Sequence, residues 1–171
     1  LYTAYGKAHI FEAIKSVESL RSVDKEAHVT LVTTGNANRN YDFKEFNHVI
    51  TSPHLCAEYL GGKVERMYPF YDKTIYLDTD TWICESLQPL FDDLDNYDVV
   101  VAPDPGEVEV EGQVAPNTGV MAYRASEDVE ALLDLYRKYY FEKELWHNHP
   151  GRKQRTDQPA FALALRDSGV K

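Results

Sequence analysis

Short β-branched runs alternate along the chain with longer stretches in which apolar residues recur at helical spacing. Strands are expected at residues 1–5, 28–33, 47–51, 73–77, 97–102 and 119–123. Helical spacing covers residues 9–21, a long stretch that begins at Ser126, and residues 157–168. Strands that alternate with helices predict an α/β domain with a mainly parallel central sheet flanked by helices. In such domains, ligands bind at the carboxyl ends of the strands.

The segments between these elements are less regular. Residues 53–71 predict a mixed, mainly helical stretch that Gly61 and Gly62 interrupt, and residues 86–91 suit a short helical turn. Loops are expected at residues 35–41, 104–116 and 147–155, where glycine, proline or polar side chains are frequent. The loop at 104–116 therefore separates two expected strands of one sheet.

Size and charge narrow the possible functions. The 171 residues, of which 43% are hydrophobic, suffice for one buried core and are too few for two. The formal net charge of −10 argues against a nucleic-acid partner, which requires a basic surface. An acidic protein can still bind phosphates where a metal ion mediates the contact.

The sequence predicts no membrane segment, because no apolar run approaches the roughly 20 residues of a membrane span. No signal peptide is recognisable either, which favours a cytoplasmic location without fixing it. Residue 1 is expected inside a strand and residue 171 just after a helix, so a domain truncated at both ends fits the sequence. A homo-oligomer is equally compatible with it.

The pair Asp78 and Asp80 directly follows the expected strand 73–77. In an extended backbone, residues two apart point the same way, with Cα atoms roughly 6 to 7 Å apart. Both carboxylates can therefore converge on one cation, and Mg²⁺ or Mn²⁺ takes one or two carboxylates together with substrate phosphate oxygens. The alternative is a solvated turn, for which Asp-x-Asp is common. The position after a strand favours the metal site.

This motif is part of a longer resemblance. MYPFYDKTIYLDTDTWICESLQPLF is similar to the metal-binding segment of glycogenin-like (family 8-like) nucleotide-diphospho-sugar transferases of the GT-A class. AYGKAHIFEAIKSVESLR resembles their nucleotide-facing first strand and helix, and APDPG, PNTGVMAYRAS and TDQPAFALAL resemble later blocks in the same order. The resemblance implies a single GT-A (Rossmann-like) domain over residues 1–171 and Mn²⁺ or Mg²⁺ held by Asp78 and Asp80. It also implies a nucleotide-diphosphate sugar donor, expected to be a UDP-sugar, and an acceptor of unknown identity.

The resemblance further indicates residues that contact the nucleotide. Lys63 and Arg66 lie three apart, so they share a face if their segment is helical, and either could reach the phosphates. A solvated helix face is the alternative for both. Ala4, Tyr5 and Gly6 resemble the family's base and ribose contacts, although Tyr5 could equally be a packing aromatic. Asp78 is expected to divide its contacts between ribose and metal.

Later residues are expected around the donor sugar. Asn117 and Thr118 precede an expected strand, where the amide of Asn117 could bond sugar hydroxyls, and Asp104 faces the sugar or caps a turn. Asp157 and Gln158 resemble the family's Asp-Gln pair beside donor and acceptor, which implies a catalytic role. Ordinary turns, and the first turn of a helix, would explain the same spacings.

The third protein ligand of the cation is left open. The glycogenin-like pattern often supplies a further histidine near its C-terminus, and no matching segment follows Lys171. His147 and His149 alternate within an expected loop, but imidazole is a poor match for hard Mg²⁺.

The expected activity is that of a metal-dependent glycosyltransferase, with a hexosyl donor. Transfer needs charge relief on the departing nucleoside diphosphate, which a cation together with Lys63 or Arg66 would supply. The resemblance implies retention of anomeric configuration, whereas the lack of an evident general base leaves an inverting outcome open.

Two other functions fit part of the pattern. A catalytically silent sugar-nucleotide-binding module would tolerate a missing C-terminal ligand. Haloacid-dehalogenase-type phosphohydrolases also carry Asp-x-Asp after an apolar strand, but on their first strand, whereas three strands are expected before Asp78. In addition, Trp82 stands where that motif has Thr or Val. A nucleotidyltransferase is disfavoured because no Gly-rich phosphate loop opens the chain.

Overall fold

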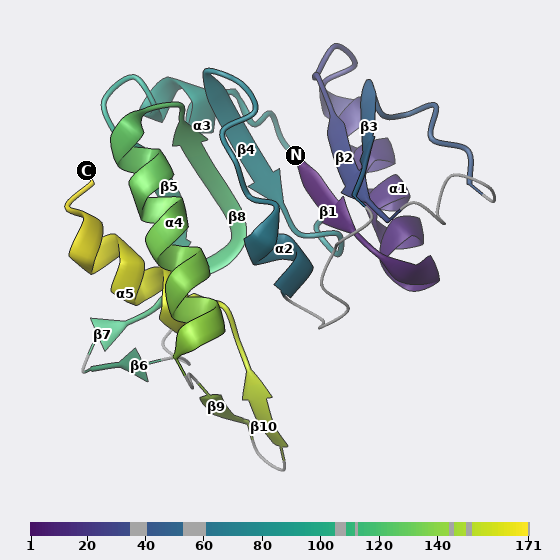
Figure 1. The fold of residues 1–171 in the computed structure, drawn as a ribbon. Coiled ribbons are helices and arrows are strands. Elements are labelled where there is room, and N and C mark those ends of the chain that lie inside the picture. Colours follow the sequence, from purple (N-terminus) through teal and green to yellow (C-terminus); the bar gives the residue numbers. More distant parts are fainter. Residues whose placement is uncertain are drawn as a thin grey trace.

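A central sheet with helices on both faces forms the body of the protein in the computed structural model (Figure 1). The structure describes residues 1–34, 41–52, 61–104, 109–111, 113–143, 146–149 and 152–170. Expectations for residues 35–40 and 53–60, including most of the Gly- and Asn-rich loop, lie outside the described residues.

Six strands make up this sheet. β1 (Tyr2–Ala4), β2 (Thr30–Thr33) and β3 (His48–Thr51) pair in parallel. β8 (Pro116–Arg124) pairs antiparallel with β4 (Lys73–Leu77) on one side and with β5 (Val99–Pro103) on the other. The two groups join at Leu1, whose nitrogen donates to the carbonyl of Ile75 at 2.7 Å and whose carbonyl accepts from Leu77 N at 3.0 Å.

These two bonds follow the parallel pattern, so the strand order is β3-β2-β1-β4-β8-β5 with only β8 reversed. The prediction of an α/β fold with a mainly parallel sheet is confirmed. The six expected strands all form, although β8 begins at Pro116, three residues earlier than the sequence pattern indicates.

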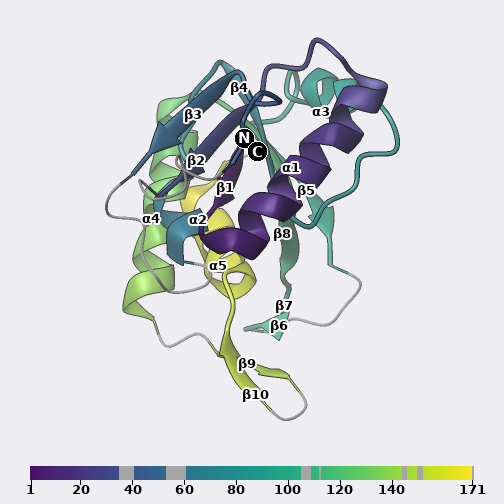
Figure 2. The same cartoon turned by 90° about the vertical axis from the view of Figure 1, so that its right-hand side faces the viewer.

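Helices cover both faces of the sheet (Figure 2). α1 (Gly6–Val23) and the short α3 (Gln88–Asp93) lie on one face, and α2 (Gly61–Glu65) and α4 (Glu127–Glu142) lie on the other. α5 (Gln158–Ser168) packs against α4. Strand side chains alternate between these layers: Tyr76 packs toward α4, whereas Ile75 and Leu77 pack toward α1.

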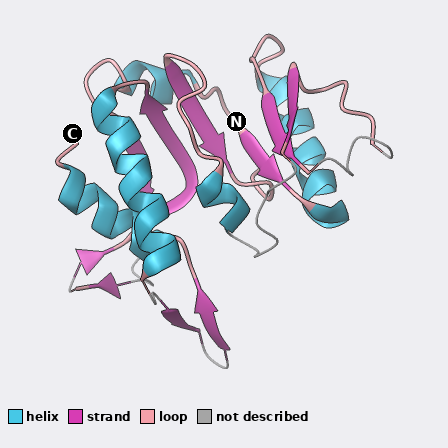
Figure 3. Ribbon diagram, in the orientation of Figure 1, coloured by secondary structure: helices cyan, strands magenta, loops and turns pink. Residues whose placement is uncertain are grey.

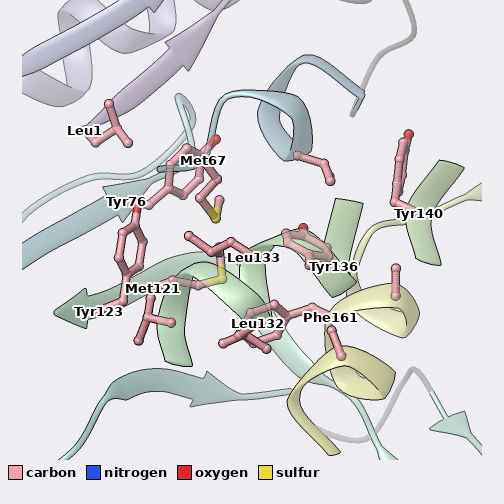
Figure 4. Packing of buried hydrophobic residues seen from close by; sticks show 14 of the residues in the cluster. Leu1, Met67, Tyr76, Met121, Tyr123, Leu132, Leu133, Tyr136, Tyr140 and Phe161 are labelled. Carbon is pink, nitrogen blue, oxygen red and sulfur yellow. The ribbon is translucent and has the colours of Figure 1, made fainter. Parts of the chain in front are cut away.

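The side of the sheet under α4 carries the larger buried side chains. Figure 4 shows sheet residues facing residues of α4 and α5, among them Tyr76, Met121, Tyr123, Leu132, Leu133, Tyr136 and Phe161. α4 starts where Ser126 accepts a hydrogen bond from Val129 N at 3.2 Å, as expected for an N-cap serine. α5 ends at Gly169, whose φ of 71° is the left-handed conformation that glycine permits.

Two loop predictions were wrong in part. β6 (Glu109–Val110) pairs with β7 (Gln113–Val114), and β9 (Trp146–His149) pairs with β10 (Arg152–Arg155), within segments expected to be loops (Figure 3). In the described part of the chain, each of these short strands pairs with its own neighbour and not with the central sheet. Such pairing depends on local turn geometry, and apolar periodicity does not detect it.

The segment before β4 is described only from residue 61 onward. The described part of helix α2 spans Gly61–Glu65, so both glycines are helical, and the expectation for the stretch before them lies outside the described residues. None of the helices in the described residues is both long and apolar enough to cross a bilayer.

Replacing Leu132 by Ala should lower the free energy of unfolding by about 2 to 5 kcal/mol, because the side chain is fully buried between α4 and the rest of the core. Leu135→Ala on the same helix is the matched control, since Leu135 is only half-buried, and it should cost clearly less. Urea unfolding at equilibrium measures both. Equal losses would mean that α4 does not pack as described.

Candidate functional site

A pocket of about 180 Å³ opens where β1 and β4 end. Four elements supply its walls: the end of β1, the first half of α1, α2, and the turn after β4. The lining residues are Thr3, Tyr5, His9, Glu12, Lys63, Tyr76, Asp78, Thr79 and Asp80. The sequence prediction of a ligand site at the carboxyl ends of the strands therefore coincides with a real concavity.

Asp78 lies half-buried at the centre of this pocket, directly after β4. Its Oδ1 accepts from Tyr76 OH at 3.1 Å and lies 3.0 Å from Nζ of Lys63. Both of these partners reach the same oxygen, and within the described chain no hydrogen bond engages Oδ2. The carboxylate is thus held by one oxygen while the other remains available to a ligand.

Gly119 of β8 gives Asp78 the room it needs. A Cβ atom at this position would lie 3.2 Å from Asp78 Oδ2 and 3.0 Å from Asn117 Oδ1, closer than almost any real Cβ contact. The backbone of Gly119 also accepts from Asp78 N at 2.7 Å. Sequence reasoning treated Gly119 only as the start of a strand, and its role in admitting the carboxylate was missed.

Lys63 is a buried cation, 5% exposed. Its Nζ lies 3.0 Å from Asp78 Oδ1 and 3.0 Å from Asp157 Oδ2, and it donates to the carbonyl of Thr118 at 2.8 Å. These contacts occupy the ammonium, so the residue links α2, β4 and β8. The expected contact with phosphate stays a prediction.

Asp157 is as deeply buried as Lys63, at 5% exposure. Besides Lys63, its Oδ2 accepts from Tyr136 OH at 2.7 Å and from Thr118 Oγ1 at 2.8 Å. The donors come from α2, α4 and β8, and Asp157 itself precedes α5. This one carboxylate oxygen therefore joins four parts of the chain that are distant in sequence.

Burial and charge act against each other in this network. Burial opposes ionisation of Asp157, but the ammonium of Lys63 and the hydroxyls of Tyr136 and Thr118 outweigh it, and the pKa lies below its usual value. Burial disfavours the charge on Lys63, but Asp157 and Asp78 together raise its pKa. Burial raises the pKa of Asp78 despite the nearby ammonium. At neutral pH, Lys63 and Asp157 form an ion pair.

Asp80 differs from Asp78 because it is exposed and makes no hydrogen bond with any described residue. Both side chains line the pocket, so the two carboxylates of the motif face the same space. The described residues contain no group of three or more His, Cys, Asp or Glu side chains that could hold a metal ion. Two carboxylates nevertheless fit a hard cation that takes its remaining ligands from phosphates and water. The side chains of His147 and His149 lie outside what the structure describes.

Three of the other residues predicted to contact the nucleotide, Ala4, Gly6 and Arg66, do not line the pocket. Ala4 is buried at the end of β1, and Gly6 begins α1 with a φ of 75°. A guanidinium nitrogen of Arg66, Nη2, lies 3.6 Å from Oε1 of Glu65, and Arg66 does not line the pocket. Tyr5 does line it, with its ring 5.5 Å from that of His9.

The expected sugar-binding residues form hydrogen bonds with other side chains or with the backbone. Asn117 Oδ1 accepts from Gly119 N at 2.8 Å, and Gln158 donates through Nε2 to Asp104 Oδ2 at 3.0 Å. Thr118 is buried and donates to Asp157. The structure thus joins Thr118 and Asp157 to Asp78 through Lys63, and it pairs Asp104 with Gln158.

Several lining residues were not singled out from the sequence. His9 and Glu12 are three apart on α1, and Thr79 stands between the two aspartates. Their only sequence signal was position: two polar residues at helical spacing just after the first strand, and the central residue of the motif. Tyr136 lies in the helix expected after Ser126, where its ring packs in the core while its hydroxyl donates to Asp157.

No family model matches this chain, and no curated protein sequence matches it. Solved structures do match over nearly its whole length. The glycosyltransferase GlyE from Streptococcus pneumoniae TIGR4, in its apo form, aligns with 98% of this chain at a TM-score of 0.59 and 19% identity. The chain has the GT-A glycosyltransferase fold.

Two further GT-A neighbours agree with this assignment. The galactosyltransferase LgtC, solved with donor and acceptor sugar analogs, aligns with 96% of this chain at a TM-score of 0.56 and 13% identity. Mouse xyloside xylosyltransferase 1 aligns with 97% at a TM-score of 0.56 and 15% identity. The chain spans 42% of GlyE, 69% of LgtC and 80% of the mouse enzyme. At these identities the similarity establishes the GT-A fold.

Lys63→Met should destabilise the GT-A domain by about 3 to 5 kcal/mol at pH 7, because it leaves Asp157 buried without a counter-ion. In the wild type the pKa of Asp157 is lowered, so its contribution is complete above the usual carboxyl pKa and is lost as pH falls through the folded value. Without Lys63, burial raises that pKa, and protonation relieves the cost. The loss of unfolding free energy in Lys63→Met, relative to the wild type, should therefore be smaller at about pH 4 than at pH 7.

Urea unfolding midpoints at the two pH values measure this effect. Lys15→Met is the matched control, since Lys15 is exposed on α1, where it contacts Glu18 and the ring of Phe11, and the change should alter stability little at either pH. A deficit for Lys63→Met that is as small as that of the control would contradict the buried ion pair.

Proposed function

We propose that this chain is the catalytic core of a metal-dependent glycosyltransferase that moves a sugar, expected to be a hexose, from a UDP-sugar to an acceptor hydroxyl. The observation that carries the proposal is the position of Asp78 and Asp80 on a GT-A fold: both follow β4 and line one pocket. The structural neighbours are themselves glycosyltransferases, which supports the same reaction class. A phosphohydrolase of the haloacid dehalogenase type is disfavoured, because β1, β2 and β3 precede the motif.

The charge of the pocket supports a cation in the mechanism. Glu12, Asp78 and Asp80 place three carboxylates among the lining residues, against one ammonium, that of Lys63. That ammonium is already paired with two carboxylates, so it cannot by itself offset a diphosphate. An anionic ligand would be repelled from this pocket unless a positive ion accompanies it.

Asp78 Oδ2 and the carboxylate of Asp80 would hold Mn²⁺ or Mg²⁺, with diphosphate oxygens among the other ligands. When bound, the cation would neutralise the charge that develops on the departing nucleoside diphosphate. Lys63 would fix Asp78 through Oδ1 and keep its other oxygen directed at the pocket. Gly119 would keep the adjacent space free of a side chain.

Asp157 and Gln158 are proposed to act at the sugar end of the site. Asp157 is held by Lys63, Tyr136 and Thr118, so it would orient the residues around it as well as the sugar. Gln158 and Asp104 form a hydrogen-bonded pair, which could bond sugar hydroxyls together with Asn117. Retention of the anomeric configuration is proposed from the resemblance to retaining enzymes.

Asp80→Asn should nearly abolish cation-dependent binding of UDP and of the donor while leaving the melting temperature unchanged. Asn keeps the size of the side chain but removes the charge that attracts a hard cation, and Asp80 is exposed without a described hydrogen bond. Isothermal titration of UDP with and without Mn²⁺, followed by donor turnover, provides the measurement. Asp93→Asn, an exposed change on α3, is the matched control.

Two results would contradict the metal-dependent mechanism, and a third would favour binding without catalysis. Full turnover by Asp80→Asn at low Mn²⁺, or wild-type turnover that survives exhaustive chelation, would rule out the metal-dependent mechanism. Metal-dependent binding of nucleotide sugars with no transfer to any acceptor and no donor hydrolysis would favour a silent binding module.

A further inference from the structure

One end of the pocket is formed by β1 and α1, and the proposed function places neither the cation nor the donor sugar there. Glu12 lies there, with a side chain 41% exposed. Its Oε2 accepts from Thr79 Oγ1 at 2.9 Å and lies 3.0 Å from His9 Nδ1. Both contacts use the same oxygen, and no described residue hydrogen-bonds Oε1. The carboxylate is therefore oriented, with one oxygen left for a ligand.

Thr3 of β1 supplies a second, independent sign of a ligand in this pocket. It lines the same pocket and is 6% exposed, yet its Oγ1 is buried with no hydrogen-bond partner among the described residues. Buried hydroxyls are nearly always paired, so an unpaired one in the wall of a pocket indicates a missing polar partner. The rings of Tyr5 and His9, whose centroids lie 5.5 Å apart, add flat apolar surface to the lining. Polar atoms and aromatic faces together suit a nucleoside.

The position of Glu12 relative to Asp78 and Asp80 indicates which part of the nucleotide it would contact. Thr79, its hydrogen-bond partner, stands between Asp78 and Asp80, so Glu12 is one contact away from the proposed cation site. In a nucleoside diphosphate the ribose is bonded directly to the first phosphate. A negative carboxylate repels phosphate but accepts hydrogen bonds from vicinal hydroxyls, as acidic residues do for ribose in dinucleotide folds.

We propose that Glu12 binds the 2′- and 3′-hydroxyls of the nucleotide ribose and makes the site selective for ribonucleotides. The inference rests on the proposed function, since it assumes a nucleoside diphosphate in this pocket. It also changes the role expected for Asp78. Because Lys63 and Tyr76 already occupy Asp78 Oδ1, its free oxygen goes to the cation, and the ribose is left to Glu12.

Binding of a ribonucleotide and its 2′-deoxy form tests this directly, without turnover. The four common ribonucleoside diphosphates are titrated calorimetrically with Mn²⁺ into the wild-type chain, and the tightest is compared with its 2′-deoxy form. The wild type should prefer the ribonucleotide about tenfold. Glu12→Gln, which keeps an acceptor for Thr79 but loses the charge, should weaken ribonucleotide binding about tenfold and remove most of the preference.

Glu18→Gln is the matched control, because Glu18 lies on the same helix, is exposed and contacts Lys15 outside the pocket. It should retain the wild-type preference, and both variants should melt close to the wild type. A wild type that binds both nucleotides equally, or a Glu12→Gln variant that retains the full preference, would overturn the inference while leaving the proposed function intact.

Two other outcomes separate the remaining alternatives. A Glu12→Gln variant with unchanged preference but a raised Mn²⁺ requirement would make Glu12 a cation ligand, which also overturns the ribose assignment. A wild type that binds none of the four diphosphates with Mn²⁺ would overturn the proposed function, and the ribose inference with it.

Discussion

The ion pair of Lys63 with Asp157 and Asp78 is the interaction on which the rest of the site depends. A buried charge is costly, and a lone ammonium or carboxylate in this position would oppose folding. Here one ammonium lies 3.0 Å from an oxygen of each carboxylate, while Tyr136, Tyr76 and Thr118 supply further hydrogen bonds. The network is satisfied only when α2, α4, β4 and β8 are all in place. The folded core therefore fixes the direction of Asp78.

The reversed strand β8 makes this arrangement possible. It lies between β4 and β5, so its first residues run past the end of β4 and bring Thr118 and Gly119 beside Asp78. Thr118 donates a hydrogen bond to Asp157. At Gly119, a Cβ atom would lie 3.2 Å from Oδ2 of Asp78, so glycine leaves room for this carboxylate. If β8 ran parallel to β4, the start of β8 would lie at the other end of the strands, away from Asp78. One antiparallel strand thus closes the site from the side away from α1.

Local patterns were sufficient for much of this architecture. The strand 73–77, the face of α4 from Val129 to Tyr140 and the motif after β4 were all recognisable, because burial and periodicity coincide there. The burial of Lys63 could not be predicted, since a lysine in a sequence usually indicates solvent exposure and only tertiary contacts show that this one is 5% exposed. Glu12 and Tyr136 were missed for the same reason: their partners, Thr79 and Asp157, are far away in sequence. The hairpin β9–β10 lacks apolar alternation, so periodicity could not find it.

Asp78 and Asp80 differ in burial, and this difference has a physical consequence for a site built from both. Asp78 is held by the core and has a raised pKa because of burial, whereas Asp80 is exposed and makes no hydrogen bond with any residue that the structure describes. A site built from two buried carboxylates would pay their full desolvation before any ligand arrived. A site built from two exposed ones would lose side-chain entropy on closing around a cation. Fixing one carboxylate with Lys63 and leaving the other in water divides these costs. The pocket carries more negative than positive charge, so free phosphates are repelled, and under the proposed function an anionic donor would enter only together with a cation.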